Sequence, residues 1–198
     1  MTKSAATSAL LLRAALVALA MSATLLWMVY EHARLLREGT EIVLKSMPID
    51  PRDLLRGHYV RLGYEISRIP AEKFTDLAQG RRLTANTPVY VLLKKGEDGY
   101  WHLVSASLTP PVKDLAPGTV MLRGTLDTTW WLGANSPVFV TYGLERYYAE
   151  KSRALRLERE IRNRRQPLGV IVRVSRDGRG AIAGLMMNGK KIYEEPLW

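Results

Sequence analysis

The chain has no cysteine among its 198 residues. A protein without cysteine forms no disulfide, carries no thiolate nucleophile and offers no cysteine ligand to a metal. The absence does not identify the compartment, because a chain without thiols is compatible with oxidising and reducing surroundings alike. The missing residue therefore restricts the chemistry of this protein and leaves its location open.

Histidine is nearly as scarce, with three residues at His32, His58 and His102. Their spacing does not place two of them on one helix face or strand face beside a carboxylate, so we predict no metal site. The chain also lacks a glycine-rich phosphate loop, a nucleophile-elbow pentapeptide and a dinucleotide-binding fingerprint. We therefore predict no cofactor and favour a non-enzymatic role over an enzymatic one.

The first part of the chain contains a long run without charge. Residues 14–30 are AALVALAMSATLLWMVY, and extension toward the N-terminus adds three leucines and only Arg13, whose side chain can snorkel to the interface. About 20 such residues are enough to cross a bilayer as a helix. Trp27 and Tyr30 stand at the C-terminal end of the run, as is typical of the headgroup region. We predict a transmembrane span at about residues 10–30.

A cleaved signal peptide is the competing interpretation of this segment, because Ala18-Leu19-Ala20 fits the pattern of a cleavage site. Cleavage there would leave several apolar residues exposed near the new terminus, and the run is longer than the apolar part of a signal peptide. We therefore predict that residues 1–38 are a signal-anchor. Basic residues precede and follow the span in similar number, and the charge rule favours an N-terminus inside the cell.

Beyond Gly39 short alternating runs are separated by Pro, Gly and Asp clusters, which predicts a mainly β (α+β) domain over residues 39–198. Within residues 58–67, alternate apolar residues share one strand face. The turn dipeptides Asp98-Gly99, Asp177-Gly178 and Asn188-Gly189 tolerate positive φ, and the last two stand where tight hairpins are expected, which predicts a meander in the C-terminal third. Further strands are predicted at residues 40–44, 88–94, 100–107, 119–126, 137–143, 169–175 and 181–187.

Two helices are predicted between the strands, a short one at residues 71–79 and a longer one at residues 144–165. The longer helix has favourable i,i+4 pairs of glutamate and arginine and ends before Pro167. Its basic stretch, residues 151–165, contributes much of the formal net charge of +10. We interpret this face as solvated, or alternatively as a contact for anionic headgroups or a partner. Beside a membrane anchor, nucleic acid is not an expected partner.

The densest group of charged and turn-forming residues is PIDPRDLLRGHYVRLGY, residues 48–64. Aspartates at 50 and 53 are placed to accept hydrogen bonds from arginines at 52 and 56, which would hold the loop in one shape. One interpretation is a well-ordered turn that leads into a core strand. The other is a ligand or partner surface formed by the basic and aromatic side chains of Arg52, Arg56, Tyr59 and Arg61.

Residues 57–64, Gly-His-Tyr-Val-Arg-Leu-Gly-Tyr, resemble the signature of the GDYXXLXY protein family, and the Asp-Pro-Arg of residues 50–52 precedes it as in that family. Residues 142–148, Tyr-Gly-Leu-Glu-Arg-Tyr-Tyr, resemble its tyrosine-rich block, and residues 178–190 resemble its terminal hairpin. On this resemblance, the candidate binding or motif residues are Asp50, Pro51, Arg52, Arg56, Gly57, His58, Tyr59, Leu62, Tyr64, Tyr142, Gly143, Glu145, Arg146 and Tyr147.

The resemblance implies a membrane-anchored domain outside the cytoplasm, linked to a polytopic membrane protein and without an assigned activity. It places the protein in a bacterial inner membrane as a single-pass protein whose C-terminal domain faces the periplasm. His58 stands where the family signature has aspartate. Because a neutral histidine still accepts one hydrogen bond, this departure favours a structural role for the motif over a catalytic one.

An anchored hydrolase is the alternative hypothesis, because Ser46-Met47 and the loop that follows resemble the Ser-Met-x-Pro box of type I signal peptidases. Ser46 would be the nucleophile, and its activation would need a buried neutral lysine on another strand. Lys45 is adjacent to Ser46 and therefore lies on the opposite strand face. The lysines that remain in the middle of the chain are Lys94, Lys95 and Lys113.

The sequence thus predicts a membrane-anchored binding or accessory domain outside the cytoplasm. Its expected partners are the lipid bilayer and an integral membrane protein. Two alternatives stay open: a hydrolase of the signal-peptidase type, and a binder of anionic headgroups or envelope polymers through residues 151–165.

Overall fold

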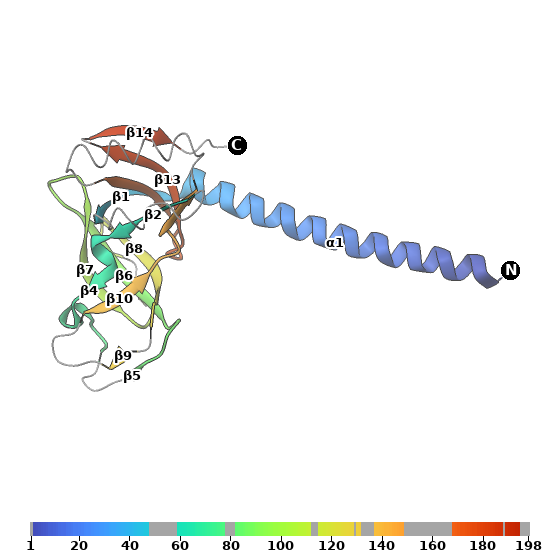
Figure 1. Ribbon diagram of the computed structural model, residues 1–198, viewed down its shortest axis with the longest axis horizontal. Coiled ribbons are helices and arrows are strands. Elements are labelled where there is room, and N and C mark those ends of the chain that lie inside the picture. Colours follow the sequence, from blue (N-terminus) through green and yellow to red (C-terminus); the bar gives the residue numbers. More distant parts are fainter. Residues whose placement is uncertain are drawn as a thin grey trace.

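The computed structural model describes most of the chain as one long helix and several antiparallel sheets (Figure 1). Two of these sheets have five strands each, and two have only two strands. The prediction of a mainly β fold with an N-terminal apolar helix is confirmed. The described residues are 2–47, 59–77, 82–111, 115–128, 130–131, 137–148, 168–187 and 189–194.

Helix α1 (Thr2–Glu38) runs without a break because the sequence contains neither proline nor glycine before Gly39. Most of it projects away from the sheets, and residues 12–30 are exposed along their whole length (Figure 1). The stretch Leu12–Glu38 is long and apolar enough to cross a membrane. The helix ends at Gly39, whose N–H donates a hydrogen bond to the Leu35 carbonyl oxygen at 3.0 Å.

The first five-stranded sheet follows directly from α1 and has the order β14-β13-β12-β1-β3. Its last three strands in sequence form the predicted C-terminal meander, with Gly178 at φ 84° and Gly189 at φ 74° in the two turns. This prediction is confirmed. The strands are β1 (Thr40–Met47), β3 (Gly63–Tyr64), β12 (Gly169–Val174), β13 (Gly180–Met187) and β14 (Lys190–Glu194).

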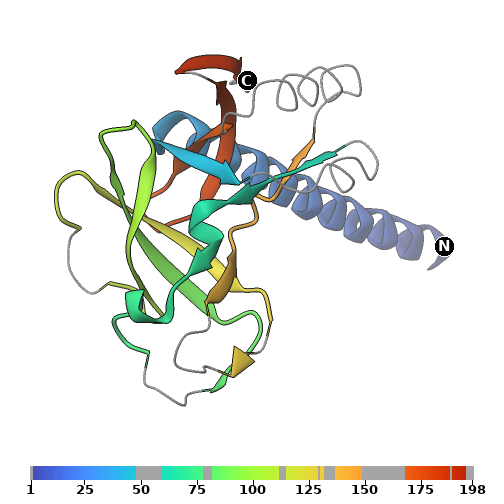
Figure 2. The same ribbon diagram turned by 60° about the vertical axis from the view of Figure 1, so that its left-hand side comes forward.

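The second five-stranded sheet has the order β4-β10-β8-β6-β7 and packs against the first (Figure 2). Its strands are β4 (Arg68–Ile69), β6 (Pro88–Lys95), β7 (Trp101–Ser107), β8 (Thr119–Leu126) and β10 (Val138–Thr141). The two small sheets pair β2 (Tyr59–Arg61) with β11 (Arg146–Tyr148), and β5 (Arg82–Leu83) with β9 (Trp130–Trp131).

The core lies between the two large sheets, where one continuous cluster of buried apolar side chains draws on both. Strands β1 and β6 each bury every second residue, as a strand with one face toward the core must. Ile42 and Leu44 from β1 and Val89, Val91 and Leu93 from β6 are completely buried. The strands predicted at residues 40–44 and 88–94 are therefore confirmed.

The prediction of one continuous strand at residues 58–67 is wrong. The chain forms β2, then β3, and then the 3₁₀ turn η1 (Glu65–Ser67), because β2 pairs with β11 whereas β3 pairs with the end of β1. The change of partner interrupts the ladder. The predicted inward face is nevertheless correct for Leu62, Tyr64 and Ile66, which are all buried.

The two predicted internal helices also need correction. Among the described residues 71–77 only the 3₁₀ turn η2 (Ala71–Lys73) is helical, because Phe74 then makes a bridge to Ala106 and is buried there; residues 78 and 79 of this prediction lie outside the described residues. The helix predicted from residue 144 does not begin there, since residues 146–148 are strand β11 and pair with β2. In both places a tertiary strand contact overrides the local helical pattern. The remainder of that prediction, residues 149–165, lies outside the described residues.

Asp76 joins the segment after η2 to the end of β7. Its carboxylate accepts hydrogen bonds of 2.9–3.1 Å from the hydroxyls of Ser107 and Thr109 and from the backbone N–H groups of Leu108 and Thr109. Burial acts to raise the pKa of Asp76, but the hydrogen bonds outweigh it and the pKa is lowered. The ionised carboxylate therefore stabilises this junction.

Substitution Asp76→Asn is expected to lower the free energy of unfolding by about 1 kcal/mol at neutral pH, because the partly exposed hydrogen bonds are screened by solvent. A lowered folded-state pKa gives stability that is present above the unfolded pKa of about 3.9 and is lost below it. The difference between wild type and variant should therefore shrink below about pH 4. Thermal unfolding of the detergent-solubilised protein at several pH values measures it, with Asp127→Asn as the control at an exposed aspartate.

Candidate functional site

The two tyrosine-rich segments of the sequence lie side by side in the structure. Strand β2 from the first segment pairs antiparallel with strand β11 from the second, with Val60 opposite Tyr147 in the register. The pairing continues where the Leu62 N–H donates a hydrogen bond of 2.8 Å to the Glu145 carbonyl oxygen. Segments about 80 residues apart in the chain thus form one local structure, the paired-motif region.

Two buried tyrosines cross-link the paired-motif region. The Tyr64 hydroxyl donates a hydrogen bond to the Leu144 carbonyl oxygen, and the Tyr142 hydroxyl donates one to the Ile66 carbonyl oxygen, both at 2.6 Å. Tyr64 is 1% exposed and Tyr142 is 8% exposed. Burial, with a smaller effect of the nearby Glu145 carboxylate, raises the pKa of both phenols. Both hydroxyls therefore stay protonated and act as structural donors.

Gly143 and Glu145 shape the turn between Tyr142 and Leu144. Gly143 adopts φ +74°, a left-handed conformation that a side chain would strain. The Glu145 carboxylate then accepts a hydrogen bond of 2.5 Å from the Tyr142 backbone N–H. This turn directs the Leu144 carbonyl oxygen toward the Tyr64 hydroxyl, so each of these motif residues contributes to one folded unit.

The end of α1 is held against the first sheet by apolar packing. Leu36, 5% exposed, packs into a small buried cluster with Ile171 from β12 and with Ala181 and Ala183 from β13. Arg173 of β12 adds a hydrogen bond from its guanidinium to the Gly39 carbonyl oxygen at 3.2 Å. The last turns of the helix are therefore part of the folded β region.

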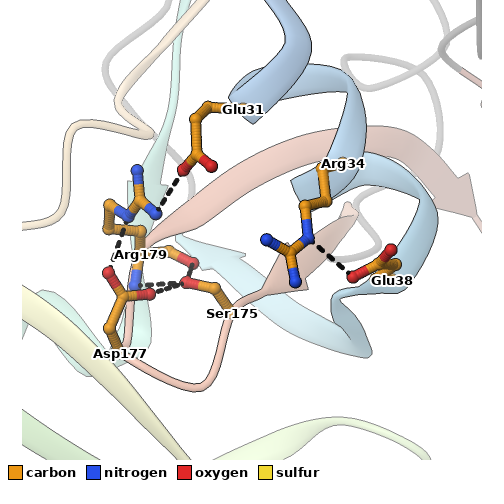
Figure 3. Close-up of polar contacts among 6 residues, drawn as sticks. All are labelled: Glu31, Arg34, Glu38, Ser175, Asp177 and Arg179. Carbon is orange, nitrogen blue, oxygen red and sulfur yellow. Dashed lines mark hydrogen bonds and ion pairs between the residues drawn. The ribbon is translucent and has the colours of Figure 1, made fainter. Parts of the chain in front are cut away.

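A group of polar contacts also ties the helix to the turn between β12 and β13 (Figure 3). The Arg179 guanidinium lies 3.0 Å from the Glu31 carboxylate and 2.7 Å from that of Asp177. The Ser175 hydroxyl donates a hydrogen bond to Asp177, and this bond and Arg179 lower the pKa of the Asp177 carboxyl. The ionised Asp177 orients Arg179 toward the helix.

A cleft of about 780 Å³ separates the end of α1 from the second sheet. Its helix wall is mainly apolar, and its opposite wall carries two arginines and two threonines. The cleft is lined by Trp27, Met28, Glu31, His32, Leu35, Arg123, Gly124, Thr125, Thr141, Tyr142, Gly143, Arg179 and Gly180. The motif turn at Tyr142 and Gly143 therefore forms part of the wall of a surface cleft.

Comparison with models of protein families shows to which family the chain belongs. The family model described as GDYXXLXY protein matches residues 21–185, which include the second half of α1 and nearly all of the β region. The chain belongs to the GDYXXLXY protein family. Comparisons with curated proteins and with solved structures give no match. The resemblance inferred from the two motifs is confirmed.

In this GDYXXLXY protein the leucine and the last tyrosine of the signature, Leu62 and Tyr64, are core residues. The structure joins them to Tyr142, Gly143 and Glu145. Arg146 lies next to them in β11, and for Tyr59 and Tyr147 only the backbone pairing is described. The remaining predicted site residues lie outside the described residues: Asp50, Pro51, Arg52, Arg56, Gly57 and His58.

The structure gives little support to hydrolase chemistry at Ser46. The Lys45 ammonium lies 3.5 Å from the Glu65 carboxylate and is partly exposed, whereas the hypothesis needs a buried lysine on another strand. In the described part of the chain no lysine or other charged side chain is buried, and Lys113 lies outside it. The same residues contain no group of three or more histidine, aspartate or glutamate side chains that could hold a metal ion.

One histidine–aspartate contact is present, between His102 and Asp98 in the β6–β7 hairpin. The His102 Nε2 atom lies 2.9 Å from the Asp98 carboxylate, and the Tyr100 N–H donates to the same carboxylate at 3.1 Å. The hydrogen bond with His102 lowers the pKa of the Asp98 carboxyl. Both side chains are partly exposed, and their contacts close the hairpin around Gly99.

The sequence analysis did not identify the contact between α1 and the β12–β13 turn. Glu31 and Arg179 are separated by 148 positions; Arg179 falls within the predicted terminal hairpin of residues 178–190, but Glu31 belongs to no motif that the sequence analysis described. The one signal in the sequence for this contact was the continuation of the helical segment beyond the expected span, into the polar stretch of residues 31–38.

Proposed function

We propose that this GDYXXLXY protein is a single-pass membrane protein whose β region is a binding or accessory subunit of a polytopic membrane protein. We place it in a bacterial inner membrane with the β region on the periplasmic side. The observation that carries the proposal is that α1 is exposed where it is apolar and firmly docked where it becomes polar. The docked end gives the β region one orientation relative to the membrane.

The exposed part of α1 carries apolar surface that a membrane or another protein is expected to bury. Large apolar side chains on it are more than half exposed, among them Leu26 at 70% and Trp27 at 65%. Apolar surfaces of this extent mark contacts with a membrane or another protein. A bilayer covers a helix of this length, and a neighbouring transmembrane helix can cover one side of it.

The docked end supports a subunit role over a freely tethered domain. A flexible linker would let the β region take many orientations, whereas the Leu36 packing and the Glu31–Arg179 ion pair restrict it to one. A fixed orientation lowers the entropy that binding to a second membrane protein must overcome. The family motifs, in contrast, have a structural role, because the hydrogen bonds of Tyr64 and Tyr142 lie within the fold.

Gentle detergent extraction of the tagged protein from its native membranes tests the proposal. We expect a polytopic membrane protein to co-purify in stoichiometric amount, because the oriented β region and α1 would contact it together. A matched control replaces residues 12–30 with an unrelated apolar helix, which keeps the anchor and shows whether the partner contacts α1 or the β region. Purification of the wild-type protein without a partner would contradict the subunit role.

The orientation has its own test. We expect the C-terminus to be periplasmic, since the charge distribution favours an N-terminus inside the cell. A reporter that works only in the periplasm should therefore be active when it is fused after Trp198. Activity of a reporter that works only in the cytoplasm would reverse the proposed topology while leaving the membrane anchor intact.

A further inference from the structure

We propose that the cleft between α1 and the second sheet binds the headgroup of an anionic phospholipid from the bilayer that α1 spans. This inference rests on the proposed membrane insertion of α1. It concerns a different surface from the basic stretch of residues 151–165, and it assigns a ligand class to a cleft that is partly built by the family motif.

The first argument is the position of the cleft along α1. Trp27 and Tyr30, whose ring centroids are 6.3 Å apart, occupy the end of the apolar run where aromatic residues meet the headgroup layer. Trp27 and Met28 form the membrane-side end of the helix wall, and Glu31 follows one helical turn later. The cleft therefore opens at the depth at which lipid phosphates and glycerol groups lie.

The second argument is the chemistry of the two walls. Trp27 and Met28 are 65% and 63% exposed and continue the apolar surface of α1, so they suit the upper part of an acyl chain. On the opposite wall, the Arg123 guanidinium is exposed and has no hydrogen-bond or ion-pair partner among the described residues. Arginine binds phosphate oxygens in a bidentate manner, so Arg123 is the residue that would hold a headgroup phosphate.

Arg179 is a weaker candidate for that phosphate. Its charge is balanced by Glu31 and Asp177, which both lie within 3.0 Å. It does, however, hold the helix wall in place opposite Arg123. Thr125 and Thr141, whose hydroxyls are 3.2 Å apart, add polar groups to the wall that carries Arg123.

The backbone of Arg123 is held in position before any ligand binds. Its backbone N–H donates a hydrogen bond of 2.8 Å to the Gly178 carbonyl oxygen, and its neighbour Gly124 allows β10 to approach closely. A Cβ at Gly124 would lie 2.5 Å from Val140 Cγ1 and 2.8 Å from the Thr141 carbonyl oxygen. The backbone of this wall is therefore rigid, which favours a built site. A volume of about 780 Å³ lies within the range of roughly 300–1,000 Å³ that is typical of ligand sites.

The combination of walls favours a lipid over an acidic loop of a partner protein. An acidic loop would satisfy Arg123 but would leave Trp27 and Met28 facing hydrocarbon and headgroups without a role. A phospholipid satisfies both walls at once, because its phosphate can pair with Arg123 while its acyl chains contact the apolar surface of Trp27 and Met28. Anionic headgroups are further attracted by the basic character of the chain.

The test measures lipid retention by the full-length protein in nanodiscs that contain equal amounts of phosphatidylglycerol and phosphatidylcholine. After transfer to detergent, native mass spectrometry counts the lipids that stay bound. We expect selective retention of phosphatidylglycerol by the wild type and a roughly 10-fold loss in Arg123→Gln, since charge-assisted hydrogen bonds to phosphate are removed. Arg123→Lys should retain an intermediate amount, because it keeps the charge and loses the bidentate geometry.

Arg176→Gln is the matched control. Arg176 is exposed on the β12–β13 turn close to α1, but it does not line the cleft. Its substitution removes the same charge near the membrane and should leave phosphatidylglycerol retention unchanged. An equal loss in Arg123→Gln and Arg176→Gln would overturn the site in favour of general attraction to an anionic surface.

Two other results would also overturn the inference. One is the absence of selective retention by wild-type protein that stays in membranes after an alkaline wash, which would leave the proposed anchor intact. The other is release of a co-purifying protein by Arg123→Gln without a change in bound lipid, which would assign the cleft to that partner. Release of the wild type itself by the alkaline wash would instead refute the membrane anchoring on which both proposals depend.

Discussion

Replacement of both Tyr64 and Tyr142 by phenylalanine is expected to lower the free energy of unfolding by about 2–6 kcal/mol. Each substitution removes one buried hydroxyl donor and leaves a buried carbonyl oxygen, that of Leu144 or Ile66, without its partner. An unsatisfied buried group costs roughly 1–3 kcal/mol. Equilibrium unfolding of the detergent-solubilised protein, followed by tryptophan fluorescence, measures the loss.

Tyr90→Phe is the control for this pair. Tyr90 lies in β6, is only partly buried, and its hydroxyl has no hydrogen-bond partner among the described residues. Its substitution should change the free energy of unfolding by much less than either motif substitution. If the double variant were no less stable than Tyr90→Phe, the two hydrogen bonds would not be what holds the paired-motif region together.

The same tyrosines predict how stability depends on alkaline pH. Burial raises the pKa of both phenols above the unfolded value of about 10, so the folded state keeps their protons more firmly than the unfolded chain does. Their contribution is therefore complete below about pH 10 and is lost as the pH rises above it. The double phenylalanine variant should lose less stability than the wild type over this alkaline range.

Leu36→Ala is expected to release the end of α1 from the first sheet. A buried leucine truncated to alanine loses about 2–5 kcal/mol of packing, and the remaining ion pair between Glu31 and Arg179 is too exposed to compensate. Because the chain has no cysteine, spin labels can be attached uniquely at introduced Leu26→Cys and Lys95→Cys. The distance distribution between the labels should be narrow in the wild type and broad in the variant.

Leu19→Ala provides the matched control, because it is the same substitution on the same helix at a side chain that is 67% exposed. It should leave the distance distribution narrow. A narrow distribution in Leu36→Ala as well would show that the Leu36 cluster is not needed to orient the β region. In that case the polar contacts of Figure 3 would have to carry the docking.

The docked helix and the paired-motif region both contribute to the walls of the cleft. Its two walls come from different parts of the chain, since α1 supplies Trp27 and Met28, and β8 supplies Arg123. The Tyr142–Gly143 turn forms part of the wall opposite the helix, and its shape depends on Glu145. A family signature that serves the fold therefore also determines the shape of a surface that faces the membrane in the proposed arrangement.

By itself the sequence determined the apolar helix, most of the long strands, the tight hairpins and the family. These features depend on local properties: the length of an uncharged run, the alternation of side chains along a strand, and glycines that tolerate positive φ. The alternation of β6 and the turn at Gly178 could thus be predicted without knowledge of the rest of the chain. The residues of the two motifs could also be named, although not their contacts.

Only the tertiary structure decided how distant segments meet. Residues 146–148 have a helical pattern, yet they form a strand because β2 lies beside them. The Tyr64–Leu144 and Glu31–Arg179 contacts join residues 80 and 148 positions apart. Such contacts depend on the packing of the two sheets and of α1 as a whole, since a local pattern carries no information about which distant segment will become its neighbour.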